Sequence, residues 1–195
     1  MAKILLREII KCTHQQKKAV RKIRNQNGVR KYMYTDHTIS LDEHLAWVQR
    51  IQHDYRQIVF IVLVDDKVGG VVSVNEIDRI NLKSDWAFYL DGSIRGGLVA
   101  ALEFGLVNFI FQTLRLEKLN CEVIETNEAV VKLHKKFGFV EEGFRRENII
   151  KNENRLGVFF LGLTKSDWRK KKETIKKRYE RVINKFDLEI EYEPN

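Results

Sequence analysis

Two patterns of hydrophobic residues divide the chain into candidate strands and candidate helices. Residues 58–64 form an uninterrupted apolar run rich in β-branched side chains, which is typical of a buried strand. Between Leu41 and Ile51 an apolar residue instead recurs every three or four positions, which predicts one face of a helix. By the same criteria we expect strands at residues 3–10, 57–64, 68–77, 85–90, 119–125, 140–150 and 155–163, and helices at 13–26, 41–51, 98–112 and 127–137.

Short signals at the helix ends support these boundaries. Ser40 is followed three residues later by Glu43, which is the spacing of a capping box, and Gly28 is a natural stop for the first helix. The resulting order is one strand, two helices, three strands, a helix, a strand, a helix and two strands. This order predicts an α+β domain with a mixed, mostly antiparallel central sheet flanked by helices.

The composition changes sharply after Trp168. We therefore expect a domain over residues 1–168 and a charged helical tail over 169–195, with Trp168 and Tyr179 as candidates for holding the tail to the domain. A solvated helix face is the ordinary interpretation of such a run, and a nucleic-acid or acidic partner is the alternative. The basic residues of the run are Arg169, Lys170, Lys171, Lys172, Lys176, Lys177, Arg178 and Arg181.

Composition narrows the class of protein without identifying it. The formal net charge of +8 invites anionic partners, but charge alone does not choose between nucleic acid, phosphate-bearing small molecules and membranes. Cys12 and Cys121 have no metal-ligand spacing, so we expect no metal site and a reducing compartment. The N-terminus lacks a signal-peptide pattern, and Glu103 and Asn108 interrupt the longest apolar stretch. These features favour a cytoplasmic protein with no membrane association.

A glycine-rich loop at residues 91–97 precedes the apolar helix that starts at Leu98. Glycines let backbone N–H groups approach a phosphate, and a helix N-terminus adds unpaired donors with partial positive charge. Arg95 adds a forked cationic donor beside Gly96 and Gly97. The loop is thus a candidate pyrophosphate site, and a plain strand-to-helix turn is the alternative.

The segment 127–139 carries a more specific pattern. Asn127, Ala129, Leu133, Gly138 and Phe139 match in register the acetyl-CoA-binding helix of the GCN5-related N-acetyltransferase (GNAT) superfamily, which this chain resembles over about residues 3–163. The resemblance implies acetyl-CoA as co-substrate, direct acetyl transfer to an amine, and no metal.

Two further clusters resemble one branch of that superfamily. The first covers residues 118–123, 132–139 and 142–143, and the second, nearer the N-terminus, covers Arg24, Asn25, Met33, Tyr34, 39–40 and His44. The branch is that of the aminosugar N-acetyltransferases of pseudaminic acid biosynthesis, which serve flagellin glycosylation. It implies a UDP-linked acceptor, UDP-4-amino-4,6-dideoxy-N-acetyl-β-L-altrosamine.

The resemblance also assigns residues to the cofactor. It implies that backbone N–H groups near Phe88, Tyr89 and Leu90 hold the thioester carbonyl oxygen, and that the 95–98 loop holds the pyrophosphate, although Leu98 replaces the usual middle glycine. The remaining cofactor-binding candidates on the matched helix are Asn127 and Lys135.

His134 occupies the position where the superfamily usually has a tyrosine that protonates the departing thiolate. An imidazole can perform this step, because it carries a donor N–H in either tautomer. A helix-surface histidine is the alternative.

Strand alternation points Glu122 away from Cys121 and Val123, toward the expected acceptor cleft, where it is a candidate general base. A solvated edge carboxylate is the alternative. Arg24 is a candidate for nucleotide phosphate, Tyr34 for stacking on a base or sugar, and His44 for acceptor contact. Packing roles for Tyr34 and His44 remain open.

Three other functions remain open at this stage. The fold also serves N-terminal acetylation of ribosomal and other proteins, for which an acidic peptide cleft would be expected. A basic nucleic-acid-binding module would give no reason for the register at 127–139. A CoA-binding protein without turnover is compatible with His134 in place of tyrosine. We expect a monomer or homodimer.

Overall fold

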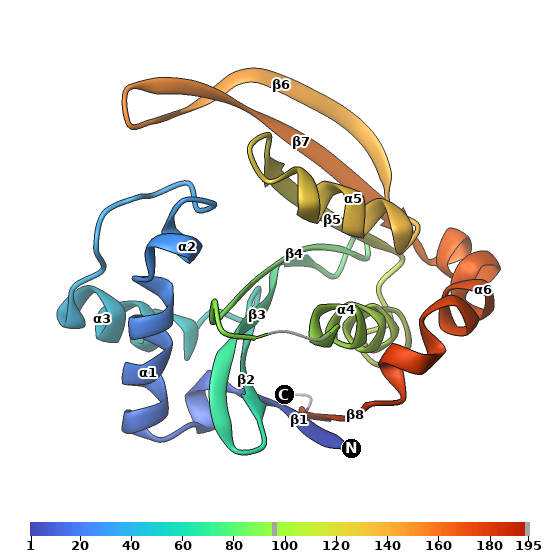
Figure 1. The fold of residues 1–195 in the computed structure, drawn as a ribbon, viewed down its shortest axis with the longest axis horizontal. Helices are drawn as coiled ribbons and strands as arrows, with labels where there is room; N and C mark the ends of the chain where they lie inside the picture. Colours follow the sequence, from blue (N-terminus) through green and yellow to red (C-terminus); the bar gives the residue numbers. More distant parts are fainter. Residues whose placement is uncertain (95–96, 194–195) are drawn as a thin grey trace.

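The computed structural model describes residues 1–94 and 97–193, which form one mixed sheet with helices on both faces (Figure 1). The strand order is β6-β7-β5-β4-β3-β2-β1-β8. The strands are β1 Ala2–Glu8, β2 Ile58–Val64, β3 Lys67–Asp78, β4 Lys83–Leu90, β5 Lys118–Ile124, β6 Val140–Lys151, β7 Asn154–Thr164 and β8 Phe186–Glu191. The α-helices are α1 His14–Arg24, α2 Asn27–Arg30, α3 Leu41–Ile51, α4 Leu98–Asn108, α5 Glu128–Lys136 and α6 Lys165–Ile183.

The apolar run of β2 is buried because helices cover both of its faces. Ile58, Phe60 and Val62 belong to the core on the α4 side, whereas Val59 and Ile61 belong to the core formed with α1 and α3. Figure 1 shows α1 and α3 on one side of β2 and β3, and α4 on the other. The predicted α+β class with a mixed, largely antiparallel sheet is therefore confirmed.

The helix boundaries follow from local capping. The box predicted at Ser40 is present, since Glu43 N donates to Ser40 Oγ at 3.1 Å and Ser40 N donates to Glu43 Oε2 at 2.7 Å. A second box joins Thr13 and Gln16 at the start of α1. The helix expected over 98–112 ends as α4 at Asn108 and continues as a short π-helix, Phe109–Thr113. Among the described residues, no helix is both long and apolar enough to cross a membrane.

The C-terminal segment differs from the expected helical tail. α6 begins at Lys165, where Thr164 caps it, and Trp168 is 2% exposed and donates its indole N–H to Asn108 Oδ1 at 3.2 Å. Further along α6, the ring of Tyr179 stacks on Phe137 with centroids 5.0 Å apart. The helix is therefore packed into the core of the domain. The expected boundary between domain and tail at residue 168 falls inside this helix.

After α6 the chain forms a strand that the sequence analysis missed. β8 pairs in parallel with β1, and its partly buried residues Phe186, Leu188 and Ile190 pack against the main core. Their alternation with acidic residues is the strand signal that a purely helical interpretation overlooked. The strand covers an edge of β1 that would otherwise be open.

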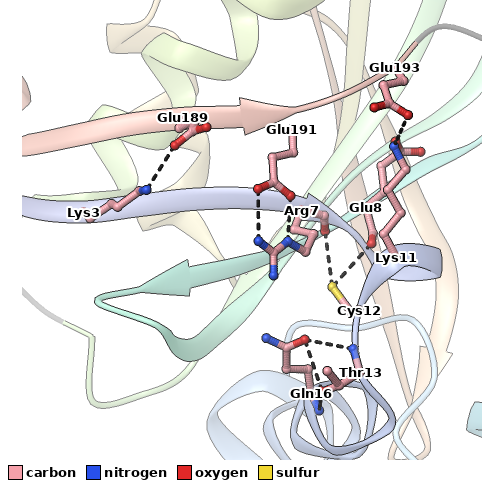
Figure 2. A network of polar contacts seen from close by, with 10 residues as sticks. All are labelled: Lys3, Arg7, Glu8, Lys11, Cys12, Thr13, Gln16, Glu189, Glu191 and Glu193. Atoms are coloured by element: carbon pink, nitrogen blue, oxygen red, sulfur yellow. Dashed lines mark hydrogen bonds and ion pairs between the residues drawn. The ribbon is translucent and has the colours of Figure 1, made fainter.

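Ion pairs bind β8 to the N-terminal segment, as Figure 2 shows. Arg7 makes a forked contact with Glu191, with Nε–Oε2 at 2.6 Å and Nη2–Oε1 at 3.0 Å, which lowers the pKa of the Glu191 carboxyl. Lys3 pairs with Glu189 at 3.1 Å. These contacts are largely solvent-exposed, so they contribute more to the register of β8 than to stability.

We expect Trp168→Ala to lower the free energy of unfolding by about 3–5 kcal/mol, because it removes a large buried side chain and a hydrogen bond. Chemical denaturation measures this change. The exposed Lys170→Ala is the control and should stay within about 0.5 kcal/mol of wild type. Equal stabilities for the two variants would show that α6 is an appendage after all.

Candidate active site

The site begins where two central strands separate. In the described part of the chain, β4 and β5 pair in parallel from Lys83–Lys118 to Asp85–Asn120, and the pairing stops there although both strands continue. Beyond that point β4 stays paired with β3 up to Leu90, and β5 stays paired with β7 up to Ile124. Alternate backbone N–H groups of β4 therefore face a gap instead of a neighbouring strand.

A cavity of about 510 Å³ occupies this gap. Its walls include residues 86–90 of β4 and 121–124 of β5, and α2 and α5 flank β4 on opposite sides (Figure 1). The lining also includes Tyr34, which follows α2, and His134 of α5. The opening between the strands thus brings residues from both faces of the sheet to one cavity.

Phe88, Tyr89, Leu90 and Asn127, all expected to bind cofactor, line this cavity. Burial raises the pKa of the Tyr89 hydroxyl, so the ring presents a neutral surface. A slot between parted strands suits a slender, mostly apolar chain with a few polar groups that can accept backbone hydrogen bonds.

His134 lies at the same cavity and is 3% exposed, so it is not the surface histidine that the sequence left open. Its Nδ1 lies 2.8 Å from Oε1 of Glu103, which is 0% exposed on α4. Burial raises the pKa of Glu103, while the hydrogen bond to His134 opposes that rise.

Tyr34 and Glu122 meet at the cavity although they are far apart in sequence. The Tyr34 hydroxyl donates a short hydrogen bond to Glu122 Oε2. Burial, and then this hydrogen bond, raise the pKa of Tyr34, so its hydroxyl keeps its proton. The positive charge of Arg145 on β6 works in the opposite direction and favours a lower pKa of Tyr34. The structure therefore joins Tyr34, which was expected to contact the acceptor, with Glu122, which was expected to act as the general base.

Lys151 anchors the segment that carries Tyr34. The lysine is 7% exposed, and its Nζ donates to the backbone carbonyls of Arg30 at 2.7 Å and Met33 at 2.6 Å. It also lies 3.7 Å from Asp36. A buried ammonium needs such partners, and by taking them Lys151 ties the end of β6 to the chain after α2. Sequence analysis gave Lys151 no role, since an isolated lysine beside a turn carries no signal.

The structure does not bring every expected site residue to the cavity. His44 is buried within α3, its ring 5.4 Å from that of Trp47, and burial lowers its pKa. The expected acceptor contact by His44 is therefore corrected to a packing role. Leu98 is core, at 2% exposure, and Lys135 pairs with Glu141 at 2.7 Å outside the cavity lining.

Arg24 lies close to the site without lining it. Its Nη2 donates to Thr35 Oγ1 at 3.0 Å, and its positive charge favours a lower pKa of Tyr89. Burial lowers its pKa, and Nη1 is buried with no partner among the described residues. The expected pyrophosphate contacts Arg95 and Gly96 lie outside the described residues, whereas Gly97 caps α4 in a left-handed conformation, φ +85°.

Comparison with known proteins adds evidence independent of this geometry. A family model described as the acetyltransferase (GNAT) domain matches residues 9–156. Acetyltransferase PseH of Campylobacter jejuni is 26% identical over 70% of this chain and 84% of its own length. Spermidine N(1)-acetyltransferase of Escherichia coli is 24% identical over 71% of this chain and 72% of its own length.

A solved structure shares the fold. The spermidine N-acetyltransferase of Vibrio cholerae, solved in complex with CoA and spermine, superimposes with a TM-score of 0.78 at 22% identity, covering 85% of this chain and 98% of that one.

A further relative by sequence is YdaF of Bacillus subtilis, whose name links it to ribosomal N-acetylation. It is 23% identical over 75% of this chain and 83% of its own length. These relatives differ in substrate, so similarity alone does not choose the acceptor.

We expect Gly97→Ala to lower the free energy of unfolding by about 1–3 kcal/mol, because φ +85° is unfavourable for alanine. In addition, the new Cβ would approach Val182 Cγ1 to 2.4 Å. Chemical denaturation provides the measurement. Gly92→Ala in the same loop is the control: its Cβ would meet Gln26 Oε1 at an ordinary 3.7 Å. A loss no larger than that of Gly92→Ala would contradict the prediction.

Proposed function

Because this chain belongs to the GNAT family of acetyltransferase domains, we propose that it acetylates the 4-amino group of a UDP-linked dideoxy aminosugar, as in pseudaminic acid biosynthesis. The family uses acetyl-CoA as the donor in N-acetyl transfer. The observation that carries the proposal is the cavity between β4 and β5, with Tyr34 and Glu122 in its lining together with His134. Similarity to PseH supports the aminosugar, although the other relatives act on other amines.

Charge near the acceptor side favours an anionic acceptor. Arg145 lies near enough to Tyr34, and Arg24 near enough to Tyr89, for each positive charge to favour a lower pKa of that tyrosine, so cationic groups lie close to the cavity. Guanidinium groups suit phosphate oxygens, because their forked donors match two oxygens at once. The phosphates of a diphosphate-linked sugar would therefore find complementary charge in these two arginines.

A polyamine is the second candidate, because Glu76, Asp85 and Glu122 also line the cavity. Two of these carboxylates already have partners: Glu76 is paired with Arg56, and Asp85 Oδ1 accepts a hydrogen bond from Asn120 at 3.0 Å. Glu122 receives only the Tyr34 hydroxyl among the described contacts. The partnered carboxylates weaken the case for a polyamine and leave Glu122 for proton transfer.

In the proposed reaction, the acceptor amine attacks the thioester carbonyl carbon while Glu122 takes the proton that the nitrogen loses. The carbonyl oxygen becomes an oxyanion, and backbone N–H groups near Phe88, Tyr89 and Leu90 stabilise it. When the carbon–sulfur bond breaks, sulfur leaves with the electron pair and His134 protonates it. The products are the amide and the free thiol of CoA.

We expect tight binding of acetyl-CoA by calorimetric titration and acceptor-dependent thiol release with the UDP-aminosugar. The matched acceptors are spermidine, a peptide with a free N-terminus, and the same aminosugar without UDP. We expect kcat/KM for the UDP-aminosugar to exceed each of the others by about 100-fold or more, because the diphosphate adds charged contacts. A higher kcat/KM for spermidine or the peptide would overturn the aminosugar assignment, and binding without turnover would indicate a CoA-binding protein that is not catalytic.

We expect His134→Ala and Glu122→Gln each to lower kcat by about 10²–10⁴-fold while the Kd for acetyl-CoA stays nearly unchanged, because both residues act on protons in transfer. Steady-state kinetics and calorimetry separate the two effects. His53→Ala, at an exposed histidine away from the cavity, should behave as wild type. Equal losses of turnover and acetyl-CoA affinity in His134→Ala would assign that residue to binding instead.

A further inference from the structure

Glu103 is a buried carboxyl that neither the fold nor the reaction described so far requires. It lies within α4, whose other buried residues are apolar, and it is 0% exposed. Its Oε1 contacts His134 Nδ1 at 2.8 Å, and its Oε2 is buried without a partner among the described residues. An unpaired, fully buried carboxylate would be costly, so this side chain calls for an explanation in terms of its one partner.

Among the described residues, Glu103 is the one polar partner of the His134 side chain. Trp86, Phe88 and Phe139 pack around the ring, with centroids 5.1, 6.1 and 5.2 Å away. Cys121 on β5 lines the same cavity, but burial raises its pKa well above the ordinary value, so it stays a neutral thiol. The other ionisable groups among the described residues that line the cavity are Tyr32, Tyr34, Glu76, Asp85, Tyr89 and Glu122.

The shared contact limits where the proton of this pair can be. If Glu103 is ionised and His134 neutral, the hydrogen bond requires the proton on Nδ1, and Nε2 is bare. One more proton makes the pair electrically neutral. It then consists either of a carboxylate with an imidazolium or of a carboxylic acid donating to Nδ1. Both neutral arrangements carry a proton on Nε2, and a site closed by aromatic rings favours the neutral pair.

We propose that Glu103 is a positioning residue that keeps a transferable proton on Nε2 of His134, so that the two side chains act as one acid. The inference rests on the proposed function, in which His134 protonates the leaving thiolate. Nδ1 is taken by Glu103, so Nε2 is the ring nitrogen that can meet a ligand in the cavity.

The proton balance of the step is complete. Sulfur takes the Nε2 proton as the carbon–sulfur bond breaks, and the pair is left with one negative charge and the remaining proton on Nδ1, bonded to Glu103. A proton from solvent restores the neutral pair once the thiol product leaves. Glu103 thereby performs the task of a second group that orients and charges a catalytic histidine.

The decisive experiment compares the pH dependence of kcat in wild type and Glu103→Gln, with acetyl-CoA and the acceptor that shows turnover. Loss of the carboxylate removes the charge that holds the imidazole proton. We therefore expect the alkaline limb of the pH profile of kcat to shift to lower pH by about 1–3 units. A role in packing alone would lower kcat or stability without moving the limb. Glu128→Gln, on an exposed residue of α5, is the charge-matched control and should leave the limb in place.

Histidine-ring NMR of the unliganded protein tests the same inference without catalysis. We expect wild-type His134 to carry its Nε2 proton at neutral pH and to retain it to higher pH than in Glu103→Gln. Should that variant fail to fold, the wild-type spectrum still decides, since a proton on Nδ1 alone at neutral pH would overturn the inference.

The outcomes separate this inference from the proposed function. If His134→Ala loses turnover but Glu103→Gln moves neither the pH limb nor the ring signals, the role of Glu103 is overturned and that of His134 stands. If His134→Ala keeps wild-type turnover, the proposed role of His134 is overturned, and this inference with it. A shifted limb together with a shifted ring titration supports both.

Discussion

The early end of the pairing between β4 and β5 is the constraint on which the rest of the site depends. Each strand keeps its outer neighbour, β3 or β7, so the sheet remains continuous while a gap opens at its centre. Parted strands leave backbone donors without a strand partner, which is costly unless a ligand meets them. The gap therefore both creates the cavity and makes its walls suited to a thioester carbonyl.

Helices on both faces of the sheet make the gap functional. α5 brings His134 to it from the face that holds the main core, and Glu103 of α4 lies behind His134 at hydrogen-bond distance. The segment after α2, held by Lys151, brings Tyr34 against Glu122. His134 and Glu122, the acid and base of the proposed reaction, thus reach the same cavity from different elements of the fold.

The C-terminal segment closes the structure around α4. Trp168 and Val182 of α6 pack against α4 and its N-terminal glycine, and Leu188 of β8 lies close to Gly105. Glycine is favoured at both Gly97 and Gly105, since an added Cβ would approach a neighbouring side chain to 2.4 and 2.1 Å, and Gly97 also has a left-handed backbone conformation. The basic character of this segment belongs to its solvent side, and its apolar residues join it to the core.

Local patterns in the sequence determined the order of strands β1 to β7 with helices α1, α3, α4 and α5, the capping box at Ser40 and the family register around Asn127, because each depends on residues close together in the chain. Only the tertiary structure decided the rest. It paired His134 with Glu103 from 31 residues away, joined Tyr34 to Glu122, withdrew His44 into the core and added β8 to β1. Such contacts depend on how helices and strands pack across a sheet. The burial that raises the pKa values of Glu103 and Tyr34 and lowers that of His44 exists only once that packing has formed.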